Sequence, residues 1–396
     1  MLPFLVAMPA FLAIITVIVT IHEFGHFLAA RACGIAVDRF SVGFGPTLWA
    51  RRDRAGVEWR VAWLPLGGYV RFAGDDNAAS VPDQEDLDDL RRRIALREGA
   101  GAERRYFFFK PLWQRALVVV AGPATNFLLS IALFAVIFGT FGEAVPSLRI
   151  AEVTAGSAAA RGGVETGDVI MAIDGHPMVG YDDFQTYIRE RPETPMRLTV
   201  LRAGHPLDIA VTPGVKFERD PAGGVTRIGL LGVASRVEKV TYGPIQAIGR
   251  GAVVTWDVVA KTGYYVARVA EGKIDWPFSG IIGTAHVTGA MTQDAIDISS
   301  SEHVSLIEVL TFQYLSLAGL LSTSIGLVNL LPIPILDGGH LLFYAYEAVA
   351  RRPLPARAQA AGYRVGLALL VGLMLFTAWH DLQGLQVFHF LGALFS

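Results

Sequence analysis

The sequence predicts a multi-pass α-helical membrane protein with about four transmembrane helices, a membrane-associated β-hairpin and one α+β domain outside the membrane. Three observations predict this fold class. Apolar residues make up 52% of the 396 residues and the mean hydropathy is +0.43, which is too apolar for an ordinary soluble enzyme. Four apolar stretches are each close to the ~20 residues that a bilayer requires. Between them lie one segment with strand-like alternation and one region of mixed strand and helix pattern.

The first apolar stretch, residues 4–30, contains a cluster of ionisable residues. Residues 2–21 carry no charged side chain, and His22, Glu23 and His26 then follow together. Ionisable groups at membrane depth are costly and usually mark function. The stretch has no positively charged segment before it and continues through the cluster, so we expect a retained span rather than a cleaved signal.

His22, Glu23 and His26 form the pattern H-E-x-x-H, which is typical of zinc hydrolases. On a helix, positions i and i+4 share a face, so both imidazoles can bind one metal ion. Zinc lowers the pKa of water, and a neighbouring carboxylate such as Glu23 can take the proton as general base. Because catalytic zinc usually has three protein ligands, a third ligand must come from elsewhere.

The third ligand has candidates at three positions. Glu58 is the nearest downstream glutamate, but it lies in a strand-like segment. The third apolar stretch, residues 312–331, runs into two prolines, and Asp337 and His340 follow. Prolines break a helix, and the freed backbone groups need protein or water as partners at membrane depth. This broken helix is the better candidate, and residue type alone leaves both Asp337 and His340 open.

The two motifs together resemble the site-2 protease family of intramembrane zinc metalloproteases. Residues 22–26 match the family's HExxH, and residues 329–339 match its N-x-x-P-x-P-x-L-D-G-G signature position by position. The resemblance implies that Asp337, rather than His340, is the third zinc (Zn²⁺) ligand beside the two histidines. It also implies that Glu23 is the catalytic residue.

Further matches extend the resemblance over most of the chain. Residues 43–45 resemble the family's G-x-G motif, residues 65–70 its membrane-associated β-hairpin, and residues 121–126 the start of its second span. The resemblance implies that the following residues contact the substrate, with Asn329 holding it or stabilising the oxyanion: Gly43, Phe44, Gly45, Gly68, Tyr69 and Asn329. The match is to the RseP-like bacterial branch with a single PDZ domain.

Residues 143–215 form the clearest soluble domain. Residues 169–173 have a strand pattern and residues 182–189 suit a helix. The segment Gly-Asp-Val-Ile at 167–170, followed by Ile-Asp-Gly at 173–175, resembles the G-D-x-I…I-x-G pattern of PDZ domains. PDZ domains bind peptides by strand addition, so we expect this domain to bind peptide or substrate ends.

The segment before the second span is expected to contain a β-hairpin followed by a polar insert. Residues 57–63 alternate and a Gly-Gly turn signal follows, so residues 37–72 are expected to be strands. A strand edge near the zinc could hold an unwound substrate by β-augmentation. Residues 75–105 are rich in charge and are expected to be solvated, with no chemistry assigned to them.

The remaining spans and the arginines complete the predicted organisation. The second and fourth spans are expected at residues 115–141 and 362–379, the latter followed by an apolar tail. Arginines are dense between the first two spans and around the break of the third, and positive loops stay cytoplasmic. The HExxH motif then lies towards the cytoplasmic face of a bacterial inner membrane, and the PDZ domain lies in the periplasm. The expected domains are residues 1–142, the N-terminal half of the membrane core; 143–215, the PDZ domain; 216–305, a linker with an amphipathic helix at 243–272; and 306–396, the C-terminal half of the membrane core.

The sequence therefore predicts a zinc-dependent intramembrane endopeptidase. The resemblance implies cleavage of a transmembrane segment of a single-pass regulatory protein, such as an anti-sigma factor, after a first site-1 cut. The expected partners are this substrate, peptide ends at the PDZ domain and the lipid bilayer. The net charge of −2 and the lack of a basic stripe give no indication of nucleic-acid binding. Cys33 is the single cysteine, so no internal disulfide is possible, and we expect it to be inert.

Two alternative functions use the same residues. A non-catalytic, PDZ-bearing membrane scaffold could retain a relic metal site. Glu23 argues against it, because this residue is needed for chemistry and not for metal binding. A metal transporter would require further ligands within the membrane, and spans two and four offer none that is obvious.

Overall fold

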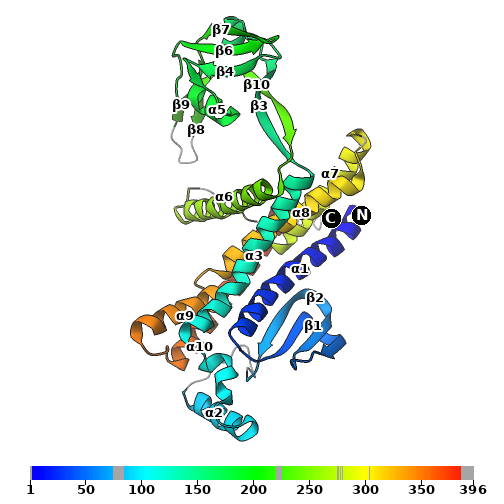
Figure 1. The fold of residues 1–396 in the computed structure, drawn as a ribbon, viewed down its shortest axis with the longest axis vertical. Helices are drawn as coiled ribbons and strands as arrows, with labels where there is room; N and C mark the ends of the chain where they lie inside the picture. Colours follow the sequence, from blue (N-terminus) through cyan, green and yellow to red (C-terminus); the bar gives the residue numbers. More distant parts are fainter. Residues whose placement is uncertain are drawn as a thin grey trace, which may run out of the picture. The chain divides into compact units, whose positions relative to one another are not determined.

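The computed structural model describes residues 2–74, 84–219, 225–273, 276, 278, 280–302 and 304–384. The chain forms two compact units (Figure 1). The membrane unit consists of Met1–Ile137, Pro244–Tyr264 and Pro277–Ser396. The other unit consists of Phe138–Gly243 and Tyr265–Trp276, and we call it the PDZ unit because it contains the PDZ-like pattern at residues 167–175.

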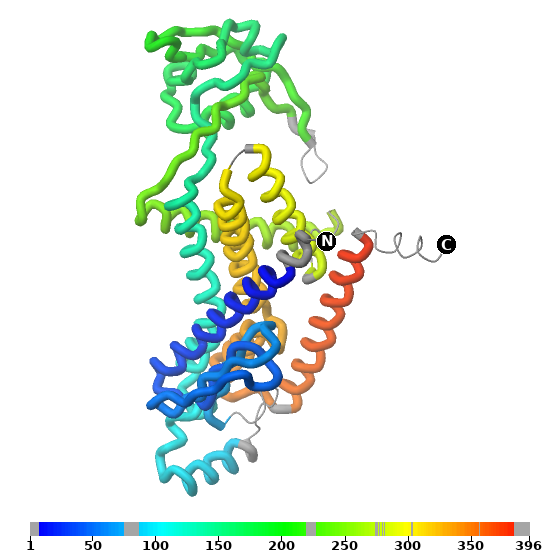
Figure 2. The backbone as a smooth tube through the Cα atoms, turned by 90° about the vertical axis from the view of Figure 1, so that its right-hand side faces the viewer, coloured from blue at the N-terminus to red at the C-terminus, as the bar shows by residue number. Residues whose placement is uncertain are grey.

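The membrane unit holds four helices that are long and apolar enough to cross a bilayer. Within the described residues these helices are α1 (Leu2–Ala32), α3 (Leu112–Thr140), α8 (Leu306–Asn329) and α10 (Ala356–Gly384). Each contains an apolar segment of 24 to 29 residues, more than the ~20 that a bilayer requires. The four expected spans overlap these helices, which confirms the predicted fold class, and Figure 2 traces their backbones. The expected apolar tail after α10 falls on residues 385–396, outside the described residues.

Two further helices occupy the region that the sequence predicts to be a linker. Helix α6 (Pro244–Ala270) corresponds to the expected amphipathic helix. Helix α7 (Ile281–Glu302) is an addition, and it contacts α1, α8 and α10. Threonine hydroxyls on α7 bond to carbonyls one turn earlier, as Thr288 and Thr292 do at 2.8 Å. This local bonding lets a helix without a continuous apolar face bury polar residues.

The expected hairpin over residues 37–72 is confirmed, with an internal fold-back. Strands β1 (Val37–Arg52) and β2 (Glu58–Phe72) are antiparallel. Phe40 pairs with both Val70 and Trp59, so the first half of β1 lies between the two halves of β2. Gly43, at φ 83°, supplies a turn conformation that other residues rarely adopt. The last segment of β2 is therefore a sheet edge, and the hairpin lies beside α1 (Figure 1).

The polar insert is partly structured. Its first residues, 75–83, lie outside the described residues. Helix α2 (Gln84–Glu98) follows, and its Ile94 is buried against Ala73 and Tyr106. Two short 3-10 turns, Ala102–Arg105 and Phe107–Phe109, then lead into α3. Most other described residues of α2 are exposed, as expected of a solvated segment, and the exception is the side that carries Leu90 and Ile94.

The PDZ unit is built on an antiparallel sheet with the strand order β10-β3-β4-β6-β7, and β5 pairs with β4. Its strands are β3 (Glu143–Val153), β4 (Val169–Ile173), β5 (His176–Pro177), β6 (Met196–Arg202), β7 (His205–Val211), β8 (Gly214–Arg219), β9 (Val225–Leu230) and β10 (Val233–Val240). Its helices are α4 (Ala158–Gly162) and α5 (Tyr181–Arg189). Strand β10 pairs with β3 along most of its length, so this unit continues beyond the expected boundary at residue 215. The pairing joins segments about 90 residues apart, and local sequence patterns carry no signal of it.

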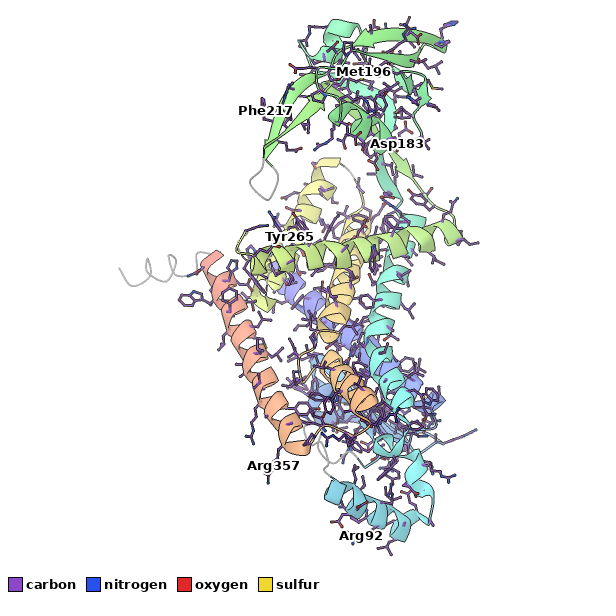
Figure 3. All side chains as sticks on the ribbon, turned by 90° about the vertical axis from the view of Figure 1, so that its left-hand side faces the viewer. Arg92, Asp183, Met196, Phe217, Tyr265 and Arg357 are labelled. Atoms are coloured by element: carbon purple, nitrogen blue, oxygen red, sulfur yellow. The ribbon has the colours of Figure 1, made fainter. Side chains whose placement is uncertain are left out.

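Apolar residues from the strands and helices fill the core of the PDZ unit, including Ile150, Ile170, Ile173, Phe184, Met196, Leu198, Val200 and Ile209. Figure 3 labels Met196 in this core and Phe217 on β8, whose side chain is 65% exposed. The aspartate of the Gly-Asp-Val-Ile segment, Asp168, is buried and accepts two hydrogen bonds from Arg202, each 2.8 Å long. These bonds hold the pKa of the Asp168 carboxyl below its usual range.

Leu198→Ala is expected to destabilise the PDZ unit by about 2–5 kcal/mol, because Leu198 is fully buried and its truncation leaves a cavity. The measurement is limited proteolysis of the purified full-length variant, with cleavage followed inside residues 143–243. Leu207→Ala is the matched control, since Leu207 on the neighbouring strand β7 is 42% exposed. Equal protease sensitivity of the two variants would contradict this account of the core.

Candidate metal centre

Helix α1 presents the two histidines on one face. His22 and His26 are one turn apart, and their ring centroids are 4.8 Å apart. Their Nε2 atoms face each other at 3.2 Å. Both rings are largely buried.

The break after α8 delivers a carboxylate to the same point. Helix α8 ends at Asn329, and the chain passes through Pro332 and Pro334 before α9 (Asp337–Ala350) begins. Asp337 is the first residue of α9, where the helix dipole favours a negative charge. Its Oδ2 atom lies 3.1 Å from the Nε2 of His22 and 3.5 Å from the Nε2 of His26.

These three donor atoms fit a tetrahedral zinc ion. Zinc bonds to nitrogen and carboxylate oxygen are about 2.0–2.2 Å long, so tetrahedral ligand atoms lie roughly 3.3–3.6 Å apart. The three separations here are 3.1, 3.2 and 3.5 Å. Oδ2 of Asp337 is also buried without a partner in hydrogen-bond geometry among the described residues. Within the described portion of the chain, the three residues form a group of side chains that could hold a metal ion.

The three residues lie on the wall of a cavity of about 700 Å³ in the membrane unit. Glu23, Asn329 and His340 line the same cavity. The cavity beside the candidate metal ligands is therefore lined by α1, α3, the break between α8 and α9, and the edge of β2. Its size can accommodate several residues of an extended peptide.

Glu23 is fixed to the edge of the hairpin sheet. The backbone N–H of Val70 on β2 donates to Oε2 of Glu23 at 3.1 Å. Gly68 lies next to this contact, since a Cβ at that position would come within 3.8 Å of Cγ of Glu23. The carboxylate is thus held between the helix that carries the two histidines and a strand edge.

Helix α3 approaches the two imidazoles closely at Gly122. The Nδ1 of His26 lies 2.8 Å from the carbonyl oxygen of Val118. A Cβ on Gly122, one turn further along α3, would lie 2.3 Å from Nε2 of His26 and 2.9 Å from Cε1 of His22. Only glycine allows this helix to approach the histidines so closely.

Gly122→Ala is expected to lower zinc affinity at least tenfold, because the added methyl group would displace the imidazoles from the positions that bind metal. The measurement is zinc binding by the purified protein in competition with a chelator. Gly289→Ala on α7 is the control, since a Cβ there meets no atom within 4 Å. The control gains the usual helix propensity of alanine, about 1 kcal/mol. Zinc affinities that agree within twofold would contradict the close-packing argument.

Comparisons with known proteins give the family. A family model described as peptidase family M50 matches residues 10–373. The chain belongs to peptidase family M50. Metalloprotease MmpA of Caulobacter vibrioides is 46% identical over 401 residues, covering 100% of both chains. A protein of Rhizobium meliloti named "Putative zinc metalloprotease" is 40% identical, covering 95% of this chain and 96% of its own.

Two further similarities are more remote. The regulator of sigma-E protease RseP of Salmonella typhimurium is 28% identical over 483 residues, covering 97% of this chain and 100% of its own. The solved PDZ domain of the SdrC-like protein of Listeria innocua aligns with 23% of this chain and 93% of its own, at 18% identity and a TM-score of 0.19. The chain is therefore a membrane metalloprotease of the M50 family that depends on zinc.

The structure brings together some of the expected site residues of this M50 metalloprotease and leaves others apart. His22, His26 and Asp337 meet, with Glu23 and Asn329 on the same cavity wall. The expected substrate-contacting residues of the hairpin do not line this cavity in the described residues: Gly43, Phe44, Gly45, Gly68 and Tyr69. Phe44 and Tyr69 instead stack on each other at 5.9 Å. Their role in substrate binding stays a prediction.

The two competing candidates, His340 and Glu58, have other partners. Rings of Phe343, Tyr344 and Tyr363 surround the imidazole of His340. Glu58 forms an ion pair with Arg39 at 3.0 Å. Neither residue belongs to the group that could hold a metal within the described residues.

Sequence reasoning missed several residues that shape the M50 site. Val70 and Val118 act through their backbones, which no side-chain pattern reveals. Arg115 and Glu347 join α3 to α9 through an ion pair of 2.6 Å on the cavity wall. The spacing of four between Val118, Gly122 and Asn126 could have indicated a helix face, but not which partner it contacts.

Proposed function

We propose that this M50 metalloprotease cuts a transmembrane segment of a single-pass regulatory protein, such as an anti-sigma factor, after a first cut by another protease. The observation that carries the proposal is the group of His22, His26 and Asp337 on the wall of a cavity between apolar helices. A zinc protease site among bilayer-spanning helices suits a substrate whose scissile peptide bond lies within a transmembrane segment. The name of the Salmonella relative, regulator of sigma-E protease, supports a link to sigma-factor control.

We assign roles to the residues of the site as follows. His22, His26 and Asp337 would hold the zinc ion, because the separations between their donor atoms suit tetrahedral binding. When bound, zinc supplies a Lewis acid that polarises the scissile carbonyl and acidifies water. Glu23 takes a proton from the attacking water and delivers it to the amide nitrogen as the C–N bond breaks. Asn329, at the end of α8, donates from its amide to the carbonyl oxygen that becomes negative.

The hairpin edge offers a means of exposing the scissile bond. A helical segment keeps its carbonyls in internal hydrogen bonds, so the substrate must be held in an extended form before attack. The last segment of β2 is an edge in contact with Glu23 through Val70. We propose that an unwound substrate segment pairs with this edge.

The proposed placement in the cell follows the arginine distribution. We propose a bacterial inner membrane location with the metal centre towards the cytoplasmic face and the PDZ unit in the periplasm. The PDZ unit would there bind peptide or substrate ends and exclude untrimmed substrates.

The proposal is tested by mapping protein N-termini in membranes of cells that carry the gene and of cells from which it has been deleted. We expect new N-termini inside the spans of single-pass proteins only when the gene is present. New N-termini confined to soluble segments would contradict intramembrane cleavage.

A further inference from the structure

We propose that Asn126 on α3 is a positioning residue that directs the metal-binding lone pair of His22 by accepting a hydrogen bond from its Nδ1–H group. The inference rests on the proposed zinc site of His22, His26 and Asp337. It assigns a role to a residue that makes no contact with the reacting atoms.

Asn126 is fully buried and held from two sides. Its amide nitrogen, Nδ2, lies 3.2 Å from Nδ1 of His22, whereas Asp337 lies beside the Nε2 of the same ring. Ser322 on α8 donates to the backbone carbonyl of Asn126 at 2.8 Å. Gly326, one turn further along α8, packs close to Cβ of Asn126. The side chain therefore has a fixed position between α1, α3 and α8.

The protonation pattern of a ligating imidazole determines what Asn126 must do. Nε2 of His22 faces Asp337 and His26, so this nitrogen must carry a lone pair to bind metal. A neutral imidazole then carries its proton on Nδ1 and needs an acceptor there. The oxygen and the NH2 group of an amide have nearly the same shape, so the side-chain amide of Asn126 can be placed either way round. With Oδ1 towards His22, it can accept the hydrogen bond from Nδ1–H. With the nitrogen facing Nδ1, Oδ1 is buried without a hydrogen-bond partner in the described residues.

The second histidine has an equivalent partner from the same helix. Nδ1 of His26 meets the carbonyl of Val118, which can only accept. Val118 and Asn126 are eight residues apart, about two turns of α3, with Gly122 halfway between them. One face of α3 thus orients both imidazoles, His26 through the backbone and His22 through a side chain. Of these two contacts, the one made by Asn126 can be removed by substitution.

Outer partners of this kind usually change metal affinity by about 10–100-fold when removed. Asn126→Leu keeps the branched shape and removes the acceptor. Asn126→Asp keeps an acceptor and removes the donor, so it separates accepting from donating. If Asn126 merely fills space, leucine would be tolerated and a buried aspartate would not.

The experiment measures zinc affinity of the purified full-length protein by chelator competition, together with the visible spectrum of the Co²⁺-loaded protein. We expect Asn126→Leu to bind zinc about 10–100-fold more weakly than wild type and to alter the Co²⁺ ligand-field bands, whereas Asn126→Asp should stay within about threefold of wild type. Ser130→Ala is the matched control, because Ser130 is buried one turn further along α3 and bonds to Thr323 instead of a histidine. Should the leucine variant fail to accumulate, Asn126→Ala carries the same expectation.

The outcomes separate the inference from the proposed site. Wild-type affinity in Asn126→Leu or Asn126→Ala overturns the inference and leaves the zinc site intact. An Asn126→Asp variant as weak as the leucine variant overturns it as well, because the amide would then act as a donor. A wild-type protein that binds no zinc overturns both.

Discussion

Glu23→Gln is expected to lower the rate of substrate cleavage roughly 10²–10⁴-fold, the usual contribution of a general acid–base. Glutamine has nearly the same shape and can still accept the hydrogen bond from the Val70 N–H. It cannot take up the proton that Glu23 must remove from water. The measurement is cleavage of a tagged single-pass protein identified by the N-terminal mapping, followed in cells that produce the variant at the wild-type level.

The zinc content of Glu23→Gln should equal that of wild type, because Glu23 is not one of the three candidate ligands. This separates loss of chemistry from loss of the metal. Cleavage at the normal rate would contradict the proposed role of Glu23. It would also favour an enzyme mechanism in which another group moves the proton.

Asp337→Ala is expected to remove zinc and, with it, all measurable cleavage. The change leaves two imidazoles, whereas catalytic zinc sites normally have three protein ligands. The loss of affinity should exceed the ~10–100-fold that outer partners contribute, since a direct ligand is lost. The measurement is metal content of the purified protein by elemental analysis at equal protein concentration.

His340→Ala is the matched control for Asp337→Ala. His340 lies three residues along the same helix and lines the same cavity, but its ring contacts aromatic residues rather than the two histidines. It should keep its zinc. Full zinc in Asp337→Ala together with loss in His340→Ala would reassign the third ligand.

The membrane core could be predicted from the sequence because bilayer crossing depends on local composition. The spans in α1, α3, α8 and α10 are each a continuous apolar run. Helix α7 lacks such a run: its residues mix threonine, glycine and acidic side chains, and its threonines bond within the helix or to neighbours. The predicted end of the PDZ unit is too early because the pairing of β10 with β3 joins distant segments.

Part of the candidate site could likewise be predicted from the sequence and part could not. The spacing of His22 and His26 fixes a shared helix face, so their approach follows from the sequence. Residue type could not decide between Asp337 and His340 as the third ligand. The path of the chain after α8 places Asp337 beside the two histidines and His340 among aromatic rings. The partner of Glu23 is a backbone N–H, and the close approach of α3 at Gly122 depends on how two helices pack. Neither of these two contacts can be predicted from a local sequence pattern.

The most direct test of the account is an anomalous difference map at the zinc absorption edge from crystals of the full-length protein. We expect a single strong peak within about 2.0–2.2 Å of Nε2 of His22, Nε2 of His26 and a carboxylate oxygen of Asp337. A peak at His340 or at any other group of residues, with none between these three side chains, would contradict it.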